Sequence, residues 1–438
     1  MSYRKLQMMQ TVCAVLVLLF TTLALPAQEI AGNWQGTLDA GARLRVILQI
    51  EKSADGTLKG TAYSIDQSPN PIPATTVSFA ANKLTFAADS IHASYEGTLS
   101  PDGNTITGVM TQGMPNPLTF ARATKETAWK IDPSPHTVQM ISVDKDVKLE
   151  VLDWGGTGRP LVLLTGLGDN AHVFDKFAPT LAATYHVYGI TRRGFGISSV
   201  PAPITANYTA ARLGEDVLAV IDALHLTRPV LAGHSLAGEE LSYIGSQHPE
   251  KVAGLIYLDA GYPYAMYDKA NGNFLIDAID LREQLNQILP GRPPADDQKK
   301  QVDDLIATLK LVEKEAAQQR QDMDHMPPPP PGRPAAPPVG VAIMTGQQRF
   351  TTIAAPALAI FAAPHDLGQM MKDKPEFRAA MEANDKRNTA RQSTAFETQV
   401  PAAHVVRIPN ANHYVFRSNE ADVLREMNAF IATLPAAN

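Results

Sequence analysis

Short, nearly continuous apolar runs recur along the second two thirds of this chain, with helical patterns between them. The runs lie at residues 161–164, 187–190, 229–232, 255–258, 358–361 and 405–408. Such runs are typical of strands that are buried on both faces of a sheet. Between two of the runs, apolar residues from Leu213 to Leu224 fall on one helix face. The alternation predicts an α/β fold over residues 137–438, a mostly parallel sheet with helices on both sides.

The region before this has the pattern of a different fold. Apolar residues occupy every second position from Leu44 to Ile50, which is the period of a half-exposed strand. Turn-forming pairs such as Asp102-Gly103 separate further short strand candidates. Residues 28–123 are therefore predicted to form a small all-β domain, an antiparallel barrel or sandwich, followed by a linker at 124–136. We expect an accessory domain, and nothing in its sequence identifies a binding partner.

The first 27 residues have the pattern of a secretory signal peptide. Arg4 and Lys5 precede an apolar stretch at residues 12–25, and a small residue follows for cleavage. An uncleaved membrane anchor is the alternative, although the stretch is short for a bilayer span. We expect an exported protein, periplasmic or extracellular, with no stable membrane span after cleavage. Its one cysteine, Cys13, lies within the signal peptide, so the mature chain would contain none.

The charge of the chain argues against a nucleic-acid partner. The 438 residues include 38 Lys+Arg and 44 Asp+Glu, with a formal net charge of −6 and no basic run. Fingerprints for dinucleotides, phosphate loops and His-Glu-x-x-His metal sites are absent from the sequence. His92, His136, His172 and His186 fall in unrelated predicted elements. We therefore expect neither a metal nor a cofactor.

One long stretch interrupts the strand–helix alternation. Residues 262–352 contain no clear buried strand, and apolar residues from Val302 to Val312 have helical spacing. Residues 327–331 are consecutive prolines, which favour extended polyproline geometry. We interpret the stretch as a lid insertion with an extended strap. An ordinary solvated surface insertion is the alternative.

The sharpest local signal is the sequence Gly-His-Ser-Leu-Ala-Gly at residues 233–238. It directly follows a predicted strand and precedes a helical stretch, which is the context of a nucleophile elbow. In such a turn the serine side chain is forced outward at the end of the strand. Small residues two positions before and after it, here Gly233 and Ala237, let the strand and the helix approach closely. The pattern predicts that Ser235 is a nucleophile.

A serine hydroxyl is a weak nucleophile and needs a base that is oriented by an acid. His413 lies in the loop after the last predicted strand and is the expected base. Asp366 follows the preceding predicted strand and is the first choice of acid. Asp259, one strand earlier, is its rival. The order Ser235, Asp366, His413 is the nucleophile–acid–base order that this architecture predicts.

The negative charge that develops on a substrate carbonyl oxygen needs backbone N–H donors, each worth on the order of 3 kcal/mol. One predicted donor is Leu236, the residue after the nucleophile. The other is Leu167, in the loop Gly166-Leu167-Gly168 after the first buried strand. Gly166 would let the backbone turn there.

Together these residues resemble the α/β-hydrolase superfamily, in its serine-nucleophile, esterase-like branch, over residues 137–435 outside the lid. Residues 192–196, Arg-Arg-Gly-Phe-Gly, are similar to a turn that is common in these enzymes. The position before the oxyanion glycine, often histidine in the family, is Thr165. The resemblance implies hydrolysis through a Ser-His-Asp triad and an acyl-enzyme, with no cofactor. It argues against epoxide hydrolases and haloalkane dehalogenases, which use a carboxylate where this chain has Ser235.

The expected function is that of an exported serine hydrolase that cleaves carboxylic esters, with a small-molecule ester or amide as its partner. An amidase or aminopeptidase of the same fold is one alternative. A non-catalytic binding protein on a hydrolase scaffold, recruited through the β domain, is another. Aromatic residues such as Tyr262 and Tyr264 are expected near the pocket and would suit an acyl or aryl group.

Overall fold

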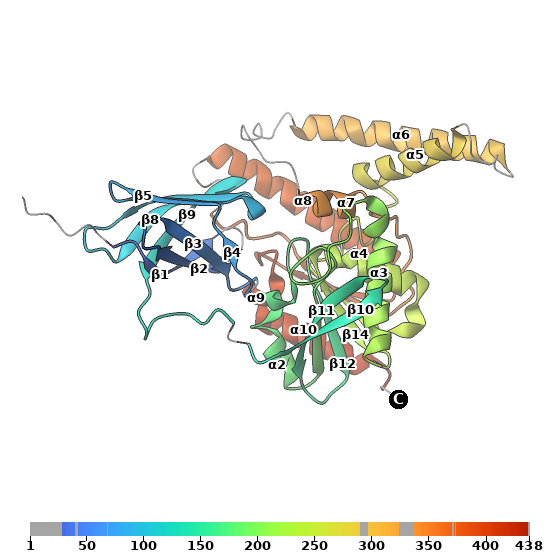
Figure 1. The fold of residues 1–438 in the computed structure, drawn as a ribbon. Helices are drawn as coiled ribbons and strands as arrows, with labels where there is room; N and C mark the ends of the chain where they lie inside the picture. The colour runs from blue at the N-terminus through green and yellow to red at the C-terminus, as the bar shows by residue number, and fades with distance from the viewer. Residues whose placement is uncertain are drawn as a thin grey trace, which may run out of the picture.

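The chain forms two β-sheets, one antiparallel and one mostly parallel (Figure 1). The computed structural model describes residues 29–39, 43–67, 69–132, 134–289, 297–323, 337–369, 372 and 374–436. The predicted signal peptide and the proline run at 327–331 lie outside the described residues. Among the helices that are described, none is long and apolar enough to cross a membrane.

The first sheet has nine strands in the order β4-β3-β2-β1-β9-β8-β7-β6-β5. They are β1 (Gly32–Asp39), β2 (Arg43–Lys52), β3 (Leu58–Ser64), β4 (Ile72–Pro73), β5 (Thr76–Ala80), β6 (Lys83–Ala88), β7 (Ala93–Leu99), β8 (Thr105–Gln112) and β9 (Met114–Arg122). Alternate residues such as Trp34, Leu48 and Tyr95 point into one core. A Cβ on Gly60 of β3 would lie 2.8 Å from Val77 of β5, so the sheet curls until its two ends meet. The predicted small β domain is confirmed, as one curled sheet.

The second sheet has eight strands in the order β10-β11-β13-β12-β14-β15-β16-β17. They are β10 (Thr137–Asp144), β11 (Val147–Gly155), β12 (Pro160–Leu164), β13 (His186–Ile190), β14 (Val230–His234), β15 (Gly254–Leu258), β16 (Ala357–Ala362) and β17 (Ala403–Ile408). β10 and β11 pair antiparallel, and the strands from β13 to β17 pair parallel. Every residue of β14, β15 and β16 is buried, because helices cover both faces. The predicted α/β fold is confirmed.

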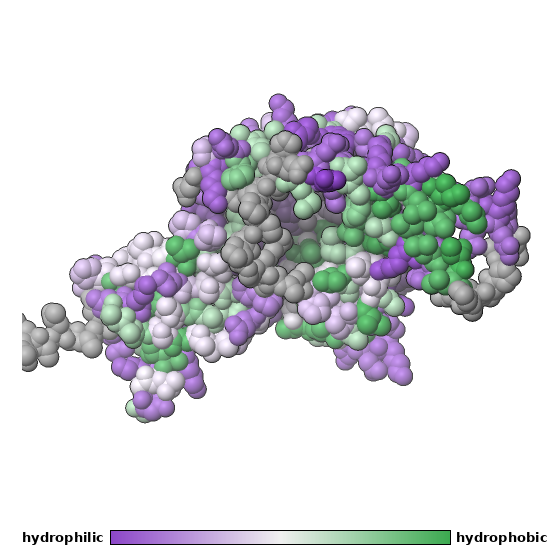
Figure 2. All heavy atoms as spheres, turned by 90° about the horizontal axis from the view of Figure 1, so that it is seen from above, coloured by the Kyte–Doolittle hydropathy of each residue, from purple (hydrophilic) through white to green (hydrophobic). Residues whose placement is uncertain are grey.

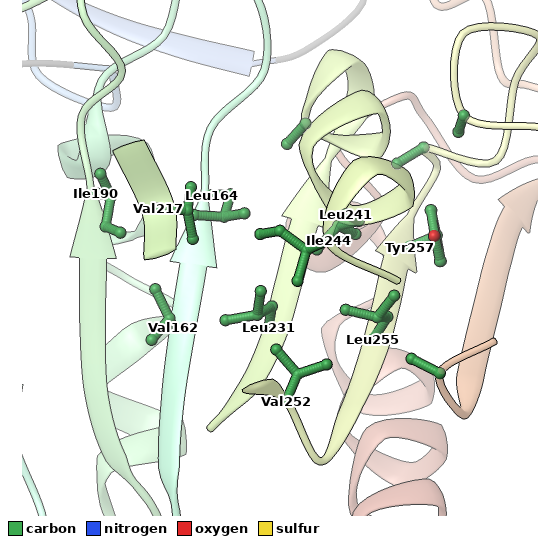
Figure 3. Close-up of a cluster of buried hydrophobic side chains, with 14 of the residues drawn as sticks. Val162, Leu164, Ile190, Val217, Leu231, Leu241, Ile244, Val252, Leu255 and Tyr257 are labelled. Carbon is green, nitrogen blue, oxygen red and sulfur yellow. The ribbon is translucent and has the colours of Figure 1, made fainter. Parts of the chain in front are cut away.

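Helices pack on the two faces of this sheet as two separate layers. The helices are α2 (Ala178–Ala182), α3 (Ala210–Ala223), α4 (Gly238–Gln247), α8 (Pro375–Gln399), α9 (Val415–Ser418) and α10 (Glu420–Thr433). Short 3₁₀ helices are η1 (Asp89–Ile91), η2 (Ala171–Phe174), η3 (Thr205–Asn207), η4 (Ser235–Ala237) and η5 (Pro249–Lys251). Side chains of α3, α4 and α8 share one core with the strands, part of which Figure 3 shows around Val217, Leu241 and Ile244. Side chains of α2, α9 and α10 share the core on the opposite face.

The described part of the insertion between β15 and β16 contains three helices joined by irregular segments. It contains α5 (Phe274–Ile288), α6 (Gln298–Met323) and α7 (Pro338–Met344), and α5 packs against α6 in a hairpin (Figure 1). The Tyr267 hydroxyl donates to Asp277 at 2.8 Å, which ties the start of α5 to the body. Apolar side chains such as Leu289 and Ile306 remain exposed on the hairpin, where Figure 2 shows a hydrophobic area.

Candidate active site

Ser235 lies in a strained turn between β14 and α4. Its φ of 52° is in the left-handed region, which non-glycine residues rarely adopt outside functional sites. A Cβ on Gly233 would lie 2.9 Å from the Ala237 Cβ, so the residue must be glycine for the turn to close. A Cβ on Gly238 would lie 2.1 Å from the Ala260 carbonyl oxygen, so α4 approaches the end of β15 closely. The expected elbow geometry is present.

His413 lies beside Ser235, in the loop between β17 and α9. Its Nε2 is 2.8 Å from the Ser235 Oγ. The His413 side chain is 42% exposed, so solvent reaches the ring. The structure therefore brings together the predicted nucleophile and the predicted base, although they are far apart in the sequence.

The acid that contacts His413 is Asp259, and the first choice, Asp366, was wrong. The Asp259 Oδ2 is 2.6 Å from the His413 Nδ1. Asp259 follows β15 with a φ of 50°, and its side chain is completely buried. Asp366 is exposed, and its Oδ1 accepts a hydrogen bond from the Gly368 N–H at 2.9 Å.

A short extension of the sheet explains why Asp366 points away. His365 forms a β-bridge with Ala411, and the Asp366 N–H donates to the Ala411 carbonyl at 2.8 Å. Neighbouring side chains in extended backbone point to opposite sides. Because the His365 ring points at Asp259, the Asp366 carboxylate lies on the solvent side.

His365 is a second histidine on the same carboxylate. Its Nε2 is 2.7 Å from the Asp259 Oδ2, and its Nδ1 is 2.7 Å from the Asp385 Oδ1. Although burial opposes protonation, Asp259 and Asp385 raise the pKa of His365 to about 10. His365 is therefore an imidazolium at neutral pH. No role was predicted for His365 from the sequence, and only its position beside Asp366, the first choice of acid, could have drawn attention to it.

The environment of Asp259 keeps its carboxylate ionised despite complete burial. Burial alone would raise the pKa, but hydrogen bonds from His365 and His413 bring the pKa of Asp259 well below its usual range. The Tyr262 hydroxyl and the Ala362 N–H also donate to its Oδ1, each at 3.0 Å. The anion is thus fixed in place by four donors.

The loop after β12 passes over the nucleophile. A Cβ on Gly166 would lie 3.0 Å from the His234 Nδ1 and 3.2 Å from the Ser235 Cβ, so the loop passes close to the serine. The two predicted oxyanion donors flank this point. Leu236 follows Ser235 and is buried, whereas Leu167 follows Gly166 and its side chain is 41% exposed. Their N–H groups remain the predicted donors.

A buried ion pair joins this loop to the helix that carries the nucleophile. The Arg192 Nε donates to Glu240 of α4 at 2.6 Å. The same guanidinium donates to the Thr165 carbonyl at 2.8 Å and to the Gly166 carbonyl at 3.1 Å. Glu240 therefore has a positioning partner inside the protein. The sequence analysis recognised the turn at residues 192–196 but gave Arg192 no role.

Two further side chains contact the site. The His234 Nε2 is 3.0 Å from the His413 carbonyl oxygen, and its ring lies against those of His413 and Tyr414. Burial lowers the pKa of His234 well below its usual value, so the ring is neutral and its Nε2–H can donate to that carbonyl. Tyr264, expected near the pocket, is close enough to Ser235 for their hydroxyls to interact.

The β domain contacts the α/β domain beside this site. The Gln67 Nε2 lies 3.5 Å from the Oδ1 of Asp169, at the end of the loop that carries Leu167. The Tyr414 hydroxyl donates to the same carboxylate at 3.1 Å. Arg417 donates to the Asp66 carbonyl and, at 2.7 Å, to the Val173 carbonyl. Tyr414, the residue after His413, and Gln67 of the β domain therefore contact the same carboxylate at the end of the predicted oxyanion loop.

A family model described as the alpha/beta hydrolase fold matches residues 159–301 of this chain. The match begins at β12 and includes the turn around Ser235 and the end of β15, where Asp259 follows. The matched residues and the eight-stranded sheet that contains them therefore have the α/β-hydrolase fold.

Curated relatives of this chain include enzymes with different activities. It is 34% identical over 119 residues to a fluoroacetate dehalogenase from a Burkholderia species, which covers 27% of this chain and 39% of that protein. It is 35% identical over 112 residues to a pyrethroid hydrolase from Sphingobium wenxiniae. This match covers 23% of this chain and 35% of that protein. It is 35% identical over 102 residues to a pimeloyl-[acyl-carrier protein] methyl ester esterase from Aeromonas hydrophila. This match covers 23% of this chain and 37% of that protein. The chain therefore spans less than half the length of each of these relatives.

Solved structures with a similar fold match the larger part of the chain. E-2-(acetamidomethylene)succinate hydrolase matches 68% of this chain and 100% of its own, with a TM-score of 0.42 and 19% identity. A hydrolase from Pseudomonas aeruginosa PA01 matches 68% of this chain and 99% of its own, with a TM-score of 0.43 and 20% identity.

Proposed function

We propose that this chain is an exported serine hydrolase that cleaves carboxylic esters through Ser235, His413 and Asp259. The observation that carries the proposal is the continuous hydrogen-bond chain from the Ser235 Oγ to the His413 Nε2, at 2.8 Å, and from the His413 Nδ1 to the Asp259 Oδ2, at 2.6 Å. A nucleophile, a base and an orienting acid in hydrogen-bond contact are the parts that acyl transfer needs.

In this mechanism the Ser235 oxygen attacks the ester carbonyl carbon while the His413 Nε2 takes the serine proton. The Leu236 and Leu167 N–H groups stabilise the oxyanion. His413 then gives its proton to the leaving alcohol, and the acyl group stays on Ser235. Water, activated by His413, releases the acid and restores the serine. Asp259 accepts the Nδ1–H throughout and balances the charge of the imidazolium.

The nucleophile separates this proposal from the other reactions of the superfamily. A dehalogenase or epoxide hydrolase of this fold uses a carboxylate at the position of Ser235, so the dehalogenase relative does not favour that activity here. One relative has the name of an ester-cleaving enzyme, the methyl ester esterase, and another is named a hydrolase of pyrethroids; the first supports ester hydrolysis. Export is proposed on the pattern of residues 1–27 alone, and sequencing the N-terminus of secreted protein tests it.

An amide substrate is the second candidate, because the same three side chains also cleave amides. An aminopeptidase needs an exposed carboxylate to bind the substrate ammonium group. The carboxylates next to the elbow do not offer one, since Glu240 pairs with Arg192 and Glu239 is fully buried. The structure therefore favours the ester over an N-terminal aminoacyl amide.

The test is fluorophosphonate labelling of the full chain together with turnover of short and long p-nitrophenyl esters. We expect labelling and turnover in the wild type, and a loss of both by at least about 10³-fold in Ser235→Ala. Ser246→Ala is the matched control, because this serine lies on α4 and its hydroxyl donates to the Thr352 carbonyl. An unlabelled wild type, or full turnover in Ser235→Ala, would refute the proposal. A faster aminoacyl p-nitroanilide would favour the amidase.

A further inference from the structure

Two histidines from unrelated elements lie side by side where the linker meets the α/β sheet. His136 precedes β10, and His172 lies in η2, which follows the loop that carries Leu167. Their ring centroids are 4.9 Å apart, with 66° between the ring planes. The two side chains are only 3% and 4% exposed. No local pattern connects them, because one belongs to a linker and the other to a loop after a distant strand.

One carboxylate, that of Asp175, stands between the two rings. Its Oδ1 is 3.3 Å from the His136 Nδ1, and its Oδ2 is 3.1 Å from the His172 Nδ1. The contact with His136 lacks hydrogen-bond geometry, and both the His136 Nδ1 and the Asp175 Oδ1 are buried without a hydrogen-bond partner among the described residues. An unpaired buried polar atom costs about 1–3 kcal/mol. Two such atoms that face each other indicate a missing ligand between them.

The outer nitrogen of each ring faces a further carboxylate. The His136 Nε2 lies 3.6 Å from Asp132, and the His172 Nε2 lies 3.5 Å from Glu150. Metal-binding histidines have this arrangement: one ring nitrogen binds the ion, and a carboxylate orients the other N–H. Donor atoms at about 2.0–2.2 Å from a tetrahedral zinc ion are separated by about 3.3 Å. The inner separations around Asp175 match this spacing.

We propose that His136, His172 and Asp175 bind one divalent transition-metal ion, with zinc as the best fit. Two imidazole nitrogens and a carboxylate are a common zinc ligand set. Ligand atoms of these three residues lie within 4.8 Å of one another, and water completes the coordination, while Asp132 orients the outer N–H of His136. The ion is structural, because it joins the linker to η2 and leaves Ser235 free.

A second cluster of histidines and an acid does not carry the same inference. Asp259, His365 and His413 also lie within 4.8 Å of one another. Every facing atom there already makes a hydrogen bond, of 2.6 Å or 2.7 Å. In the first cluster the His172 Nδ1 is likewise hydrogen-bonded to the Asp175 Oδ2, but the His136 Nδ1 and the Asp175 Oδ1 have no such partner among the described residues. We assign no metal to this cluster.

The first experiment measures zinc in the full chain, purified without a histidine tag. The protein is stripped with a chelator and titrated with Zn²⁺ alone, while calorimetry counts the ions bound and thermal unfolding gives the Tm. We expect one zinc ion per chain, and a Tm that falls on stripping and recovers with Zn²⁺. Fluorophosphonate labelling of Ser235 serves as an independent readout, which zinc should not change.

Variants locate the site. His136→Gln should lose zinc binding, and Asp132→Asn should bind about 10- to 100-fold more weakly. His186→Gln, a histidine outside the cluster that pairs with Asp153, is the matched control and should bind normally. If His136→Gln does not fold, Asp175→Asn, which keeps the side-chain shape, decides the matter. Zinc loss in His413→Ala instead would overturn the assignment, because it would place the ion at the active site.

A metal-free cluster is the competing account, in which a proton takes the place of the ion. Burial lowers the pKa of His172, but the carboxylates of Asp175 and Glu150 outweigh this effect and raise the pKa to about 9, so the ring would be charged. This account predicts no zinc uptake at micromolar concentrations and no effect of a chelator on the Tm. Those two results together would overturn the proposal.

Discussion

Asp259 accepts more hydrogen bonds than the orientation of one histidine requires. His413 and His365 share its Oδ2, and Tyr262 and the Ala362 N–H share its Oδ1. A carboxylate has room for about four such donors, so all its acceptor sites are filled. The acid is therefore held rigidly while buried, and His365 supplies a positive charge that compensates for the lost hydration.

The first residue-scale prediction compares the two candidate acids. Asp259→Asn should lower kcat by up to about 10⁴-fold, because an amide can stabilise the wrong tautomer of His413. Asp366→Asn should leave kcat unchanged, since its carboxylate contacts a loop N–H at the surface. The measurement is steady-state hydrolysis of a p-nitrophenyl ester, with the Tm as a check on folding. The reverse outcome would restore Asp366 as the acid.

The second residue-scale prediction concerns stability at high pH. The pKa of His365 is about 10 in the folded protein, against about 6.5 when unfolded, so the folded state holds a proton that the unfolded state releases. The stabilisation is complete below about pH 6.5 and is lost as the pH rises toward 10. The free energy of unfolding should fall by up to about 1.4 kcal/mol per pH unit in this window.

The His365→Gln variant should be less stable than the wild type at pH 6. Its free energy of unfolding should also fall less steeply between pH 7 and pH 10. Denaturant unfolding at several pH values measures both. His404→Gln is the control, because this exposed histidine lies 3.7 Å from Glu426 at the surface. If the free energy of unfolding had the same pH dependence in the wild type and in His365→Gln, the positive charge assigned to His365 would be wrong.

At the scale of elements, the hairpin of α5 and α6 is attached to the body through a cluster of carboxyl groups. Glu315 of α6 is buried and reaches toward Gly272, where a Cβ would lie 1.7 Å from its Oε1. Asp277 of α5 lies beside it and also accepts from Tyr267 and Arg349. Burial, with the neighbouring Asp277, raises the pKa of Glu315 to about 8. The hairpin is thus packed around a protonated carboxyl group.

The element-scale prediction is that the local stability of α6 decreases as the pH rises. An acid whose pKa is raised in the folded state stabilises it fully below about pH 4.5, and this stabilisation is lost as the pH passes 8. Hydrogen exchange within residues 298–323, corrected for its intrinsic pH dependence, should become faster between pH 6 and pH 9. Glu315→Gln keeps a neutral side chain and should remove the change, whereas Glu313→Gln should not. An unchanged pH response in Glu315→Gln would refute the prediction.

At the scale of the whole molecule, the β domain forms part of the surroundings of the proposed active site. Asp66 pairs with Arg45 within the β sheet and with Lys176 across the interface, at 2.8 Å and 3.0 Å. Arg417, on the short helix that follows His413, donates to the Asp66 carbonyl. Movement of the β domain would therefore be transmitted to the loops on both sides of Ser235.

The prediction at this scale uses Arg417. Arg417→Gln removes charged donors from two carbonyl groups, and each such hydrogen bond is worth about 1.5–3 kcal/mol. We expect a lower Tm and faster hydrogen exchange at residues 64–67 and 171–175. Arg425→Gln is the control, since this arginine pairs with acids at the surface, where such pairs contribute about 0–1 kcal/mol. If both variants changed the Tm and the hydrogen exchange equally, the contacts of Arg417 would not stabilise the interface between the β domain and the α/β domain.

The sequence by itself determined the strands and the turn around Ser235, and it indicated that His413 would lie beside this serine. Continuous apolar runs can be buried only inside a covered sheet, and the small residues around Ser235 permit only a tight turn. These are local constraints, so a linear pattern records them. His413 was predictable for the same reason, because it follows the last strand.

Only the tertiary structure decided between Asp259 and Asp366, since both follow parallel strands and both end at the same edge of the sheet. The choice depends on which side chain the His365 bridge turns inward, and that is a contact between distant segments. The meeting of His136 with His172 and the approach of Gln67 to Asp169 are likewise contacts over long sequence separations. A local pattern contains no record of them, because they arise only when the two sheets pack together.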